Sequence, residues 1–366
     1  MIRKHTLNIG NSTVEAACFE PEDGVKEYHL LIHACPSSDF NSQLESLQTA
    51  LRTFLDEEIR GATPVFMRYF LSDASNQQQA VKEASAGAAC PVSIIEQAPL
   101  DGTKAALWVY LTTRLNDSYS HLWTASNTSD AVGSELQTSD ILREYESALV
   151  QNGCSVADNC IRTWFFVQNV DVNYAGVVKG RREYFDAVGL THKTHYIAST
   201  GIAGRTASAE SKVMMDAYSI KGLEPQQITY LKGSTHLNPT HEYGVTFERG
   251  TSVDYGDRRH VFISGTASIN NKGEVVHPGD VGRQTERMME NVDILLQEAG
   301  CGYEDVPYMI VYLRDISDAT IVRQIFDQRF PTTPKVFLWA PVCRPGWLVE
   351  MECMAVMPAD NRFEKL

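Results

Sequence analysis

Apolar residues recur every three or four positions in two long segments of the chain, and this spacing predicts two amphipathic helices that each bury one face. In residues 42–57 the apolar positions are Leu44, Leu47, Leu51, Phe54 and Leu55. In residues 281–299 they are Val281, Met288, Val292, Leu295 and Leu296. Asp280 is placed to cap the start of the second helix, and Gly300 is placed to end it.

A proline-led apolar run follows each helix and predicts a buried strand. Pro64 and Pro307 begin these runs, and the same interval separates Tyr69 from Tyr312. A second helical segment and two further strand-like runs then follow in each half of the chain. The shared order predicts two related α+β domains, each a sheet with two helices on one face.

The segment between the two repeats belongs to neither. Residues 116–140 are rich in Ser, Thr, Asn and Asp, which predicts a surface loop. Further along, the pattern predicts two helices, at 141–153 and 174–187, with a strand at 162–166 between them and alternating strand and loop at 191–240. We therefore expect domains at 1–115 and 245–366, with 116–244 as a linker and inserted middle segment.

Composition and charge exclude several classes of function. Of 366 residues, 43% are hydrophobic and 21% charged, as in ordinary globular proteins. The net charge of −14 and the absence of a basic run argue against a nucleic-acid partner. The apolar runs are strand-sized, and no apolar segment follows Arg3 and Lys4, so we expect no membrane contact, no secretory signal and a cytoplasmic location.

Cysteine and histidine spacing gives no support for a cofactor. The eight cysteines form no C-x-x-C pair and no zinc-like spacing to a histidine, so we interpret most of them as small buried side chains, with a nucleophilic cysteine as the alternative. His236 and His241 have no third candidate ligand nearby in the sequence. Residues 199–204 lack the remainder of a phosphate-binding fingerprint. We expect neither a metal nor an organic cofactor.

Several stretches between about residues 245 and 358 resemble the RidA/YjgF family, namely Phe262–Ile269, His277–Asp280, the helix Gln284–Ala299 and Cys343–Glu352. The first half resembles that family in element order only. The resemblance implies that each half is a RidA/YjgF-like (chorismate mutase-like) domain, a mixed sheet with two helices on one face. Because RidA-like domains usually trimerise with clefts between subunits, it also implies either a homo-oligomer (trimer) or a pseudo-symmetric monomer.

The order of a degenerate copy, a middle segment and a motif-bearing copy is similar to that of the chorismatases, RidA-related enzymes that hydrolyse chorismate. The likeness extends to residues 160–358 through Arg162, Trp164 and the pair Gly180-Arg181. Residues 236–239 depart from it, because they read His-Leu-Asn-Pro where chorismatases carry Tyr-x-Tyr-Pro. Lys335 stands where RidA deaminases carry a carboxylate-binding arginine, and a lysine cannot form the same two-pronged contact.

Two glutamates are candidates for the catalytic group. Glu350 and Glu352 alternate with apolar residues on a predicted strand and therefore share one face. That face is either the solvent-exposed side of an antiparallel sheet or the wall of a cleft. The resemblance favours the cleft for Glu350 and leaves Glu352 open. Because burial can raise a carboxyl pKa toward neutrality, we predict Glu350 as the acid/base.

Arginines and hydroxyl groups are candidates for substrate binding. Arg344, in a turn, and Arg181, on a predicted helix, can each hold a carboxylate, although a surface role is equally compatible with the position of Arg344. Further contacts, with a polar turn or simple packing as the alternatives, are predicted for Gly265, Thr266, Ser268 and Tyr243.

The leading functional hypothesis is a cofactor-free, chorismatase-like hydrolase acting on the enol ether of chorismate or of a related small carboxylated substrate. A RidA-like enamine or imine deaminase is one alternative. A protein that binds small carboxylates without turnover is another.

Overall fold

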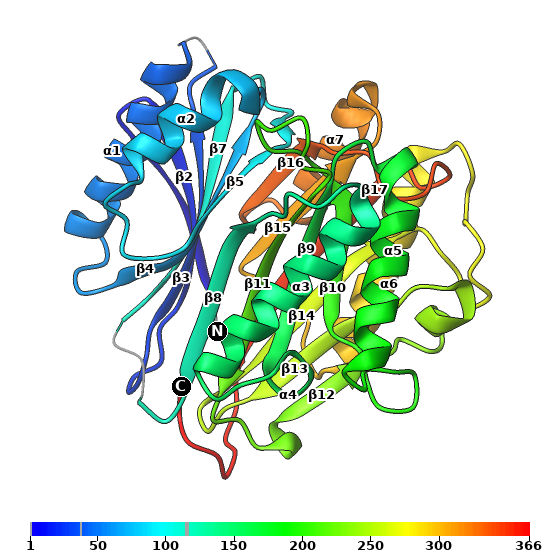
Figure 1. The fold of residues 1–366 in the computed structure, drawn as a ribbon. Helices are drawn as coiled ribbons and strands as arrows, with labels where there is room; N and C mark the ends of the chain where they lie inside the picture. Colours follow the sequence, from blue (N-terminus) through cyan, green and yellow to red (C-terminus); the bar gives the residue numbers. More distant parts are fainter. Residues whose placement is uncertain (1, 37–38, 114–116) are drawn as a thin grey trace.

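A computed structural model of the protein describes residues 2–36, 39–113 and 117–366, with all of these side chains except that of Tyr243. Three β-sheets follow one another along the described chain, and each has helices on one face (Figure 1). We call the three parts the N-terminal unit (residues 3–112), the middle unit (120–221) and the C-terminal unit (228–358).

The N-terminal unit has a six-stranded sheet in the order β1-β2-β3-β7-β4-β5. Its strands are β1 (Arg3–Ile9), β2 (Ser12–Phe19), β3 (Glu27–Ala34), β4 (Thr63–Leu71), β5 (Val92–Glu96) and β7 (Ala105–Thr112). The two helices are α1 (Phe40–Glu57) and α2 (Ala74–Ala84). Side chains of Asp39 and Asp73 cap them by accepting from backbone N–H groups, as expected of aspartate at this position.

The C-terminal unit repeats this arrangement in the order β12-β13-β14-β17-β15-β16-β6. Its strands are β12 (Ile228–Leu231), β13 (Gly250–Asp254), β14 (Arg258–Ala267), β15 (Tyr308–Leu313), β16 (Lys335–Trp339) and β17 (Val349–Pro358), with β6 (Ala98–Pro99) added from the N-terminal unit. Its helices are α6 (Val281–Glu298) and α7 (Ala319–Arg329). The predicted cap is confirmed, since the Asp280 side chain accepts from the N–H of Arg283. Gly300 ends the helix with a φ of +76°.

The middle unit has a sheet of its own, in the order β10-β9-β11-β8. Its elements are β8 (Ser120–Asn127), α3 (Ser134–Gln151), α4 (Val156–Asn159), β9 (Cys160–Val167), α5 (Val170–Ala187), β10 (Ala198–Ala203) and β11 (Val213–Lys221). The loop predicted for 116–140 is therefore wrong for β8 and the start of α3. Strand β8 lies at the edge of its sheet and is half-buried along most of its length, so its polar composition resembles that of a loop.

Four strands are arranged identically in all three units. The orders β3-β7-β4-β5, β8-β11-β9-β10 and β14-β17-β15-β16 correspond, and in each the last two strands are parallel while their neighbours are antiparallel. The two RidA-like domains expected from the sequence are thus present, and the segment between them has the same core. Short 3-10 helices connect the remaining elements, at Pro225–Gln227, Thr240–Tyr243, Tyr303–Asp305 and Ile316–Asp318.

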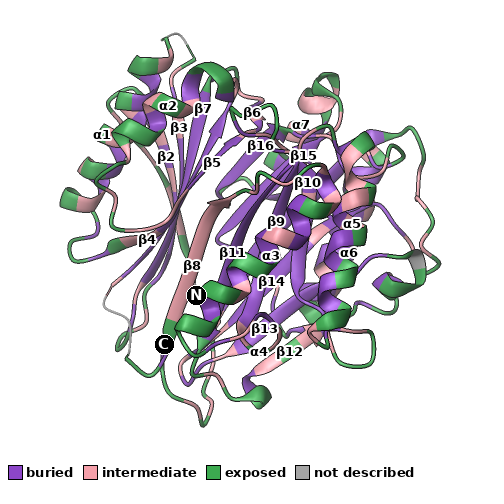
Figure 2. Ribbon diagram, in the orientation of Figure 1, coloured by how far each residue is buried: buried purple, intermediate pink, exposed green. Residues whose placement is uncertain are grey.

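Each unit is joined to both of the others, so the three close into a ring. Leu338 of β16 pairs with Pro99 of β6, Glu96 with Arg205, and Ile202 of β10 with Val342. The helices lie on the outside, with exposed outward faces, and the strands between them are mostly buried (Figure 2). The interior faces of the three sheets share one core.

The repeat predicts that Tyr69 and Tyr312 are counterparts, and this is wrong. The register of β4 shifts between Pro64 and Phe66, so the two strands fall out of step by one residue. Tyr69 packs in the cluster beneath α1 and α2, whereas Tyr312 belongs to the interior core. None of the helices in the described ranges is both long and apolar enough to span a membrane.

Candidate active site

A small cavity lies where the middle unit meets the C-terminal unit. Its volume is about 30 Å³, enough for about two water molecules. The middle unit contributes Tyr174, Arg181, Ser199 and Gly201 to its lining, and the C-terminal unit contributes Val245, Phe247, Arg249, Gly265, Ala267, Ile269, Cys343, Arg344, Trp347 and Glu350. A ligand larger than a few atoms requires some of these side chains to move.

Glu350 is the second residue of strand β17 and faces the cavity across from Gly265. The register of β14 against β17 shifts between Ile263 and Thr266, which brings the β14 backbone close to the carboxyl. A Cβ at position 265 would lie 2.3 Å from Oε1 of Glu350. Only glycine therefore leaves room for the carboxyl where it stands.

The Glu350 carboxyl is buried, with 4% of the residue exposed, so the solvent-exposed alternative for this face does not hold. Burial raises its pKa to about 8, the nearby charge of Glu352 acts in the same direction, and Arg162 and Arg249 act against it. At neutral pH the group therefore retains its proton for the most part. A protonated carboxyl facing a cavity is a candidate general acid.

Glu352 lies on the same face of β17 but points into the shared core. Its Oε2 accepts from Nη2 of Arg162 at 2.9 Å, and its Oε1 accepts from Nε1 of Trp164 at 2.7 Å. Arg68 approaches the same Oε1 to 3.9 Å and binds Asp216 at 2.8 Å. Arg68, Arg162, Asp216 and Glu352 thus form a buried ion network, and its members come from all three units. Glu352 is occupied within it and does not line the cavity.

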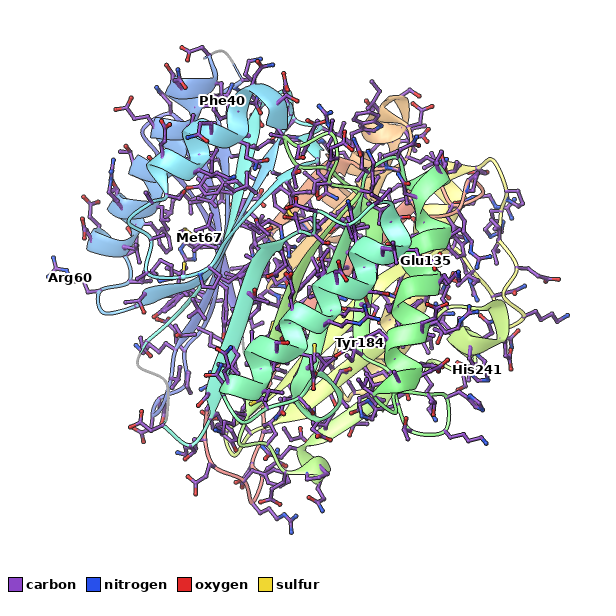
Figure 3. All side chains as sticks on the ribbon, in the orientation of Figure 1. Phe40, Arg60, Met67, Glu135, Tyr184 and His241 are labelled. Carbon is purple, nitrogen blue, oxygen red and sulfur yellow. The ribbon has the colours of Figure 1, made fainter. Side chains whose placement is uncertain are left out.

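Arg181 reaches the cavity from helix α5. Its Nε donates to Oγ1 of Thr246 at 3.1 Å, and its Nη1 donates to Oγ of Ser199 at 3.4 Å. The preceding residue, Gly180, lets α5 pack closely on α3, because a Cβ there would lie 2.4 Å from the backbone oxygen of Glu135. Figure 3 shows these two helices side by side, with Glu135 on α3 and Tyr184 on α5. This contact accounts for a glycine directly before the arginine.

Arg249 was not singled out from the sequence, yet it lines the cavity and is buried. Its Nη2 donates to the backbone oxygen and Oδ1 of Asn238, at 3.0 and 3.1 Å. Asn238 belongs to the His-Leu-Asn-Pro stretch that departs from the chorismatase pattern, so this departure holds a cavity arginine in place. The only available signal was an arginine directly before strand β13, which by itself has many explanations.

Arg344 lies in the turn before β17, is half-buried, and has its guanidinium carbon 5.6 Å from the ring centre of Trp347. Together with Arg181 and Arg249 it makes three arginines around one acid. Among the described lining residues, Glu350 is the only carboxylate. With Glu350 protonated, the cavity is strongly electropositive and suits an anionic ligand.

Thr266 and Ser268, predicted as ligand contacts, are not among the residues that line this cavity. The cavity-lining residues of this segment are Gly265, Ala267 and Ile269, and alternation along the chain turns the residues between them to the other side. The hydroxyl of Thr266 donates to the backbone oxygen of Ser264, and that of Ser268 to the backbone oxygen of Val276.

Two further residues singled out from the sequence, Tyr243 and Lys335, are not among the described residues that line the cavity. The side chain of Tyr243 is outside the described part of the structure. Lys335 lies at the joint between the N-terminal and C-terminal units, where its Nζ donates to the backbone oxygen of Phe330 at 3.0 Å and approaches Asp327 to 3.2 Å. The identity of residue 335 therefore does not bear on what this cavity binds.

Cys343 lines the cavity but is not suited to act as a nucleophile. Burial raises the pKa of its thiol to about 12, and the adjacent Glu350 adds to the effect. The side chain shares a hydrogen bond with Tyr174. Within the described residues, no three His, Cys, Asp or Glu side chains are grouped as a metal would require.

Comparison with known proteins places the C-terminal unit in a well-populated group. Residues 252–357 match the family model described as endoribonuclease L-PSP. A RutC family protein of Pyrococcus abyssi is 33% identical over 98 residues, which cover 26% of this chain and 76% of that protein. The 3-aminoacrylate deaminase RutC of Acinetobacter baylyi is 28% identical over 97 residues, covering 26% of this chain and 77% of the relative.

One solved structure resembles the chain over most of its length. The crystal structure of a chorismatase at 1.08 Å resolution superposes with a TM-score of 0.65 and 21% sequence identity. The match covers 82% of this chain and 95% of the other. The two proteins therefore share a fold over that part of the chain.

Proposed function

Since the chain belongs to the RutC family, within the RidA superfamily, we propose that it hydrolyses the enol ether of chorismate or of a related small dicarboxylate, with Glu350 as the acid. The observation that carries this proposal is a buried Glu350 with a pKa near 8 in a cavity whose other charged lining residues are three arginines. An enol ether of this kind combines carboxylates for the arginines with a carbon atom that must be protonated.

The reaction follows from these groups. Arg181, Arg249 and Arg344 supply guanidinium groups to the two carboxylates. Glu350 transfers its proton to the methylene carbon of the enol ether, which forms a carbon–hydrogen bond and leaves an oxocarbenium ion. The resulting Glu350 carboxylate then takes a proton from water as the water oxygen attacks the cationic carbon that bears the ether oxygen, which forms a hemiketal. The hemiketal then collapses: the bond between this carbon and the ether oxygen breaks, the proton of the hemiketal hydroxyl passes to that oxygen, and pyruvate and the ring alcohol leave.

The surroundings of Glu350 suit both of its protonation states during the reaction. Burial and Glu352 favour the protonated acid before reaction, whereas Arg162 and Arg249 stabilise the carboxylate that forms when the proton leaves. Because these charges are fixed in a buried network, they need no rearrangement during the reaction. The similarity of fold to a chorismatase supports the assignment at the level of architecture.

An enamine deaminase is the second candidate, and the cavity volume favours it. About 30 Å³ suits a three-carbon acid better than a ring dicarboxylate. The RutC relative from Acinetobacter baylyi is named a 3-aminoacrylate deaminase, and protonation of an enamine carbon would use Glu350 in the same way. Three arginines, however, exceed what one carboxylate needs.

Incubation of the purified protein with chorismate and with 3-aminoacrylate, following pyruvate and ammonia respectively, tests the proposal. We expect pyruvate from chorismate with the natural chain and none above background with Glu350→Gln. Ammonia release alone would replace the proposal by the deaminase. If neither product forms while both carboxylates raise the melting temperature, the protein binds small carboxylates without turnover.

A further inference from the structure

In the described structure, the sheet of the middle unit ends at β8, two strands earlier than the other two sheets, which continue through β2 and β1 and through β13 and β12. In the N-terminal unit, β3 carries β2 on its free side, and in the C-terminal unit, β14 carries β13. Their counterpart β8 pairs with β11 and has no further strand beside it in the described structure. Figure 2 shows β8 half-buried along its length, next to strands that are fully buried. An edge strand of this kind presents unpaired backbone N–H and C=O groups.

In the two complete units, the additional strand also closes a joint with the next unit. Glu15 of β2 accepts from the backbone N–H of Lys335, the first residue of β16, at 2.8 Å. Glu248, two residues before β13, accepts from the N–H of Tyr196 at 2.8 Å and donates its own N–H to the oxygen of Ile197 at 3.0 Å. In both joints, a glutamate of the added segment meets the backbone that leads into a neighbouring parallel strand.

At the third joint, between β8 and the N-terminal unit, no added strand lies beside β8 among the described residues. Ser126 of β8 accepts from the N–H of Ile94 at 3.2 Å and donates to the oxygen of Val92 at 3.4 Å, and a cavity of about 590 Å³ lies beside this contact. Figure 1 shows β8 facing the N-terminal sheet across this joint. The lining residues come from the start of β4, the segment before β5, strand β8 and helix α3: Pro64, Val65, Ala89, Cys90, Pro91, His121, Leu122, Trp123, Thr124, Asn127, Glu144, Tyr145, Ala148, Leu149 and Asn152. The cavity therefore continues the joint that β2 and β13 fill in the other units.

The backbone on the far wall matches the filled joints in detail. Met67 donates to the oxygen of Pro91 at 3.1 Å, just as Met309 donates to the oxygen of Pro334 at 2.9 Å. The residue after Pro334 is Lys335, whose N–H binds Glu15, and the residue after Pro91 is Val92. Val92 thus occupies the position at which a glutamate of an added strand is bound in the N-terminal unit's joint.

We propose that the cavity beside β8 binds one extended segment of a partner polypeptide as an added strand. The segment runs antiparallel to β8, because β2 is antiparallel to β3 and β13 to β14. Its backbone pairs with the free edge of β8, and it carries a glutamate directed at residues 89–92. Residues of helix α3 and of the start of β4 line the cavity into which this segment fits.

A synthetic peptide of residues 246–255 is a suitable probe, because this segment fills the corresponding joint of the C-terminal unit. Its binding to the full chain is measured by fluorescence anisotropy, and the contact is located by hydrogen exchange. We expect saturable binding, slower exchange of amides in 120–127, and at least tenfold weaker binding of a peptide with lysine in place of its glutamate.

Two variants that fill the cavity beside β8, together with one control variant, test whether the peptide binds there. Ala148 and Ala89 line opposite walls and are exposed, so Ala148→Trp and Ala89→Trp fill the cavity without disturbing the core. Ser147 is exposed on the same helix but does not line the cavity, so Ser147→Trp is the matched control. Both groove variants should weaken peptide binding at least tenfold, and the control should not. Absence of saturable binding, protection outside 120–127, or unchanged binding by both groove variants would overturn the proposal.

Discussion

Glu350 and Glu352 are two residues apart on one face of β17, yet of the two only Glu352 is bonded to an arginine of the described structure, through Nη2 of Arg162 at 2.9 Å. Glu352 is thereby held as part of a buried ion network, while Glu350 is left facing the cavity beside a like charge. The same short sequence therefore places a structural carboxylate and a protonated acid next to each other.

The first prediction concerns the acid itself. Glu350→Gln keeps the size of the side chain and removes its transferable proton, so we expect the turnover rate on the substrate identified to fall by about 10²- to 10⁴-fold. Affinity for a non-reacting dicarboxylate, measured by calorimetry, should change little because the arginines remain. A variant with unaltered turnover would remove Glu350 from the mechanism.

The second concerns stability as a function of pH. The pKa of Glu350 is raised to about 8 in the folded chain from its ordinary value of 4.5. Between these values the unfolded state has lost the proton that the folded state keeps, so this group makes the free energy of unfolding decrease as pH rises. The favourable contribution of Glu350 to the free energy of unfolding is complete below about pH 4.5 and is lost by about pH 8. Urea unfolding at pH 5 and pH 8.5 should show Glu350→Gln gaining stability relative to the natural chain at the higher pH.

The third concerns Gly265. A methyl group at this position would lie 2.3 Å from Oε1 of Glu350, so Gly265→Ala must displace the carboxyl or the strand. We expect a loss of about 1–3 kcal/mol in the free energy of unfolding, with a fall in turnover that exceeds any change in substrate affinity. Gly279→Ala is not an adequate control because Gly279 has a φ of +76°. Gly87→Ala, at an exposed site with no atom within 4 Å of the added carbon, is the matched control and should leave turnover intact.

The fourth concerns the arginine that sequence reasoning missed. Removing the Arg249 guanidinium takes away a charged hydrogen-bond donor, worth about 1.5–3 kcal/mol. Arg249→Met should therefore raise KM roughly 10- to 100-fold. Arg249→Lys should recover only part of this loss, because an ammonium group cannot bind a carboxylate with two parallel hydrogen bonds. Equal KM values in all three proteins would show that Arg249 does not contact the substrate.

The sequence repeat was sufficient to identify the N-terminal and C-terminal units, because long amphipathic helices and proline-led strands have a strong periodic signal. It was insufficient for the middle unit, since β8 is a half-buried edge strand whose Ser, Thr and Asn residues resemble a loop. The equivalence of Tyr69 and Tyr312 failed for a different reason, a one-residue shift in strand register that sequence spacing does not show.

The site residues that could be predicted from the sequence are those that belong to the C-terminal family motif. Glu350, Arg344 and Gly265 all belong to the C-terminal motif, and the structure places all three on the cavity wall. Thr266 and Ser268 belong to the same motif but face away, because the bulge in β14 determines which residues alternate toward the cavity. Arg249 depends on packing of the β13 segment against another unit, and no local pattern reports such a contact.

The pH dependence of kcat/KM for pyruvate release from chorismate tests the central claim most directly, because it reports both the reaction and the protonation state of its acid. We expect a plateau through neutral pH and a tenfold fall per pH unit above about pH 8, with the plateau activity of Glu350→Gln lower by about 10²- to 10⁴-fold. Release that increases through pH 8, or a profile that Glu350→Gln leaves in place, would contradict the assignment of Glu350 as a protonated general acid.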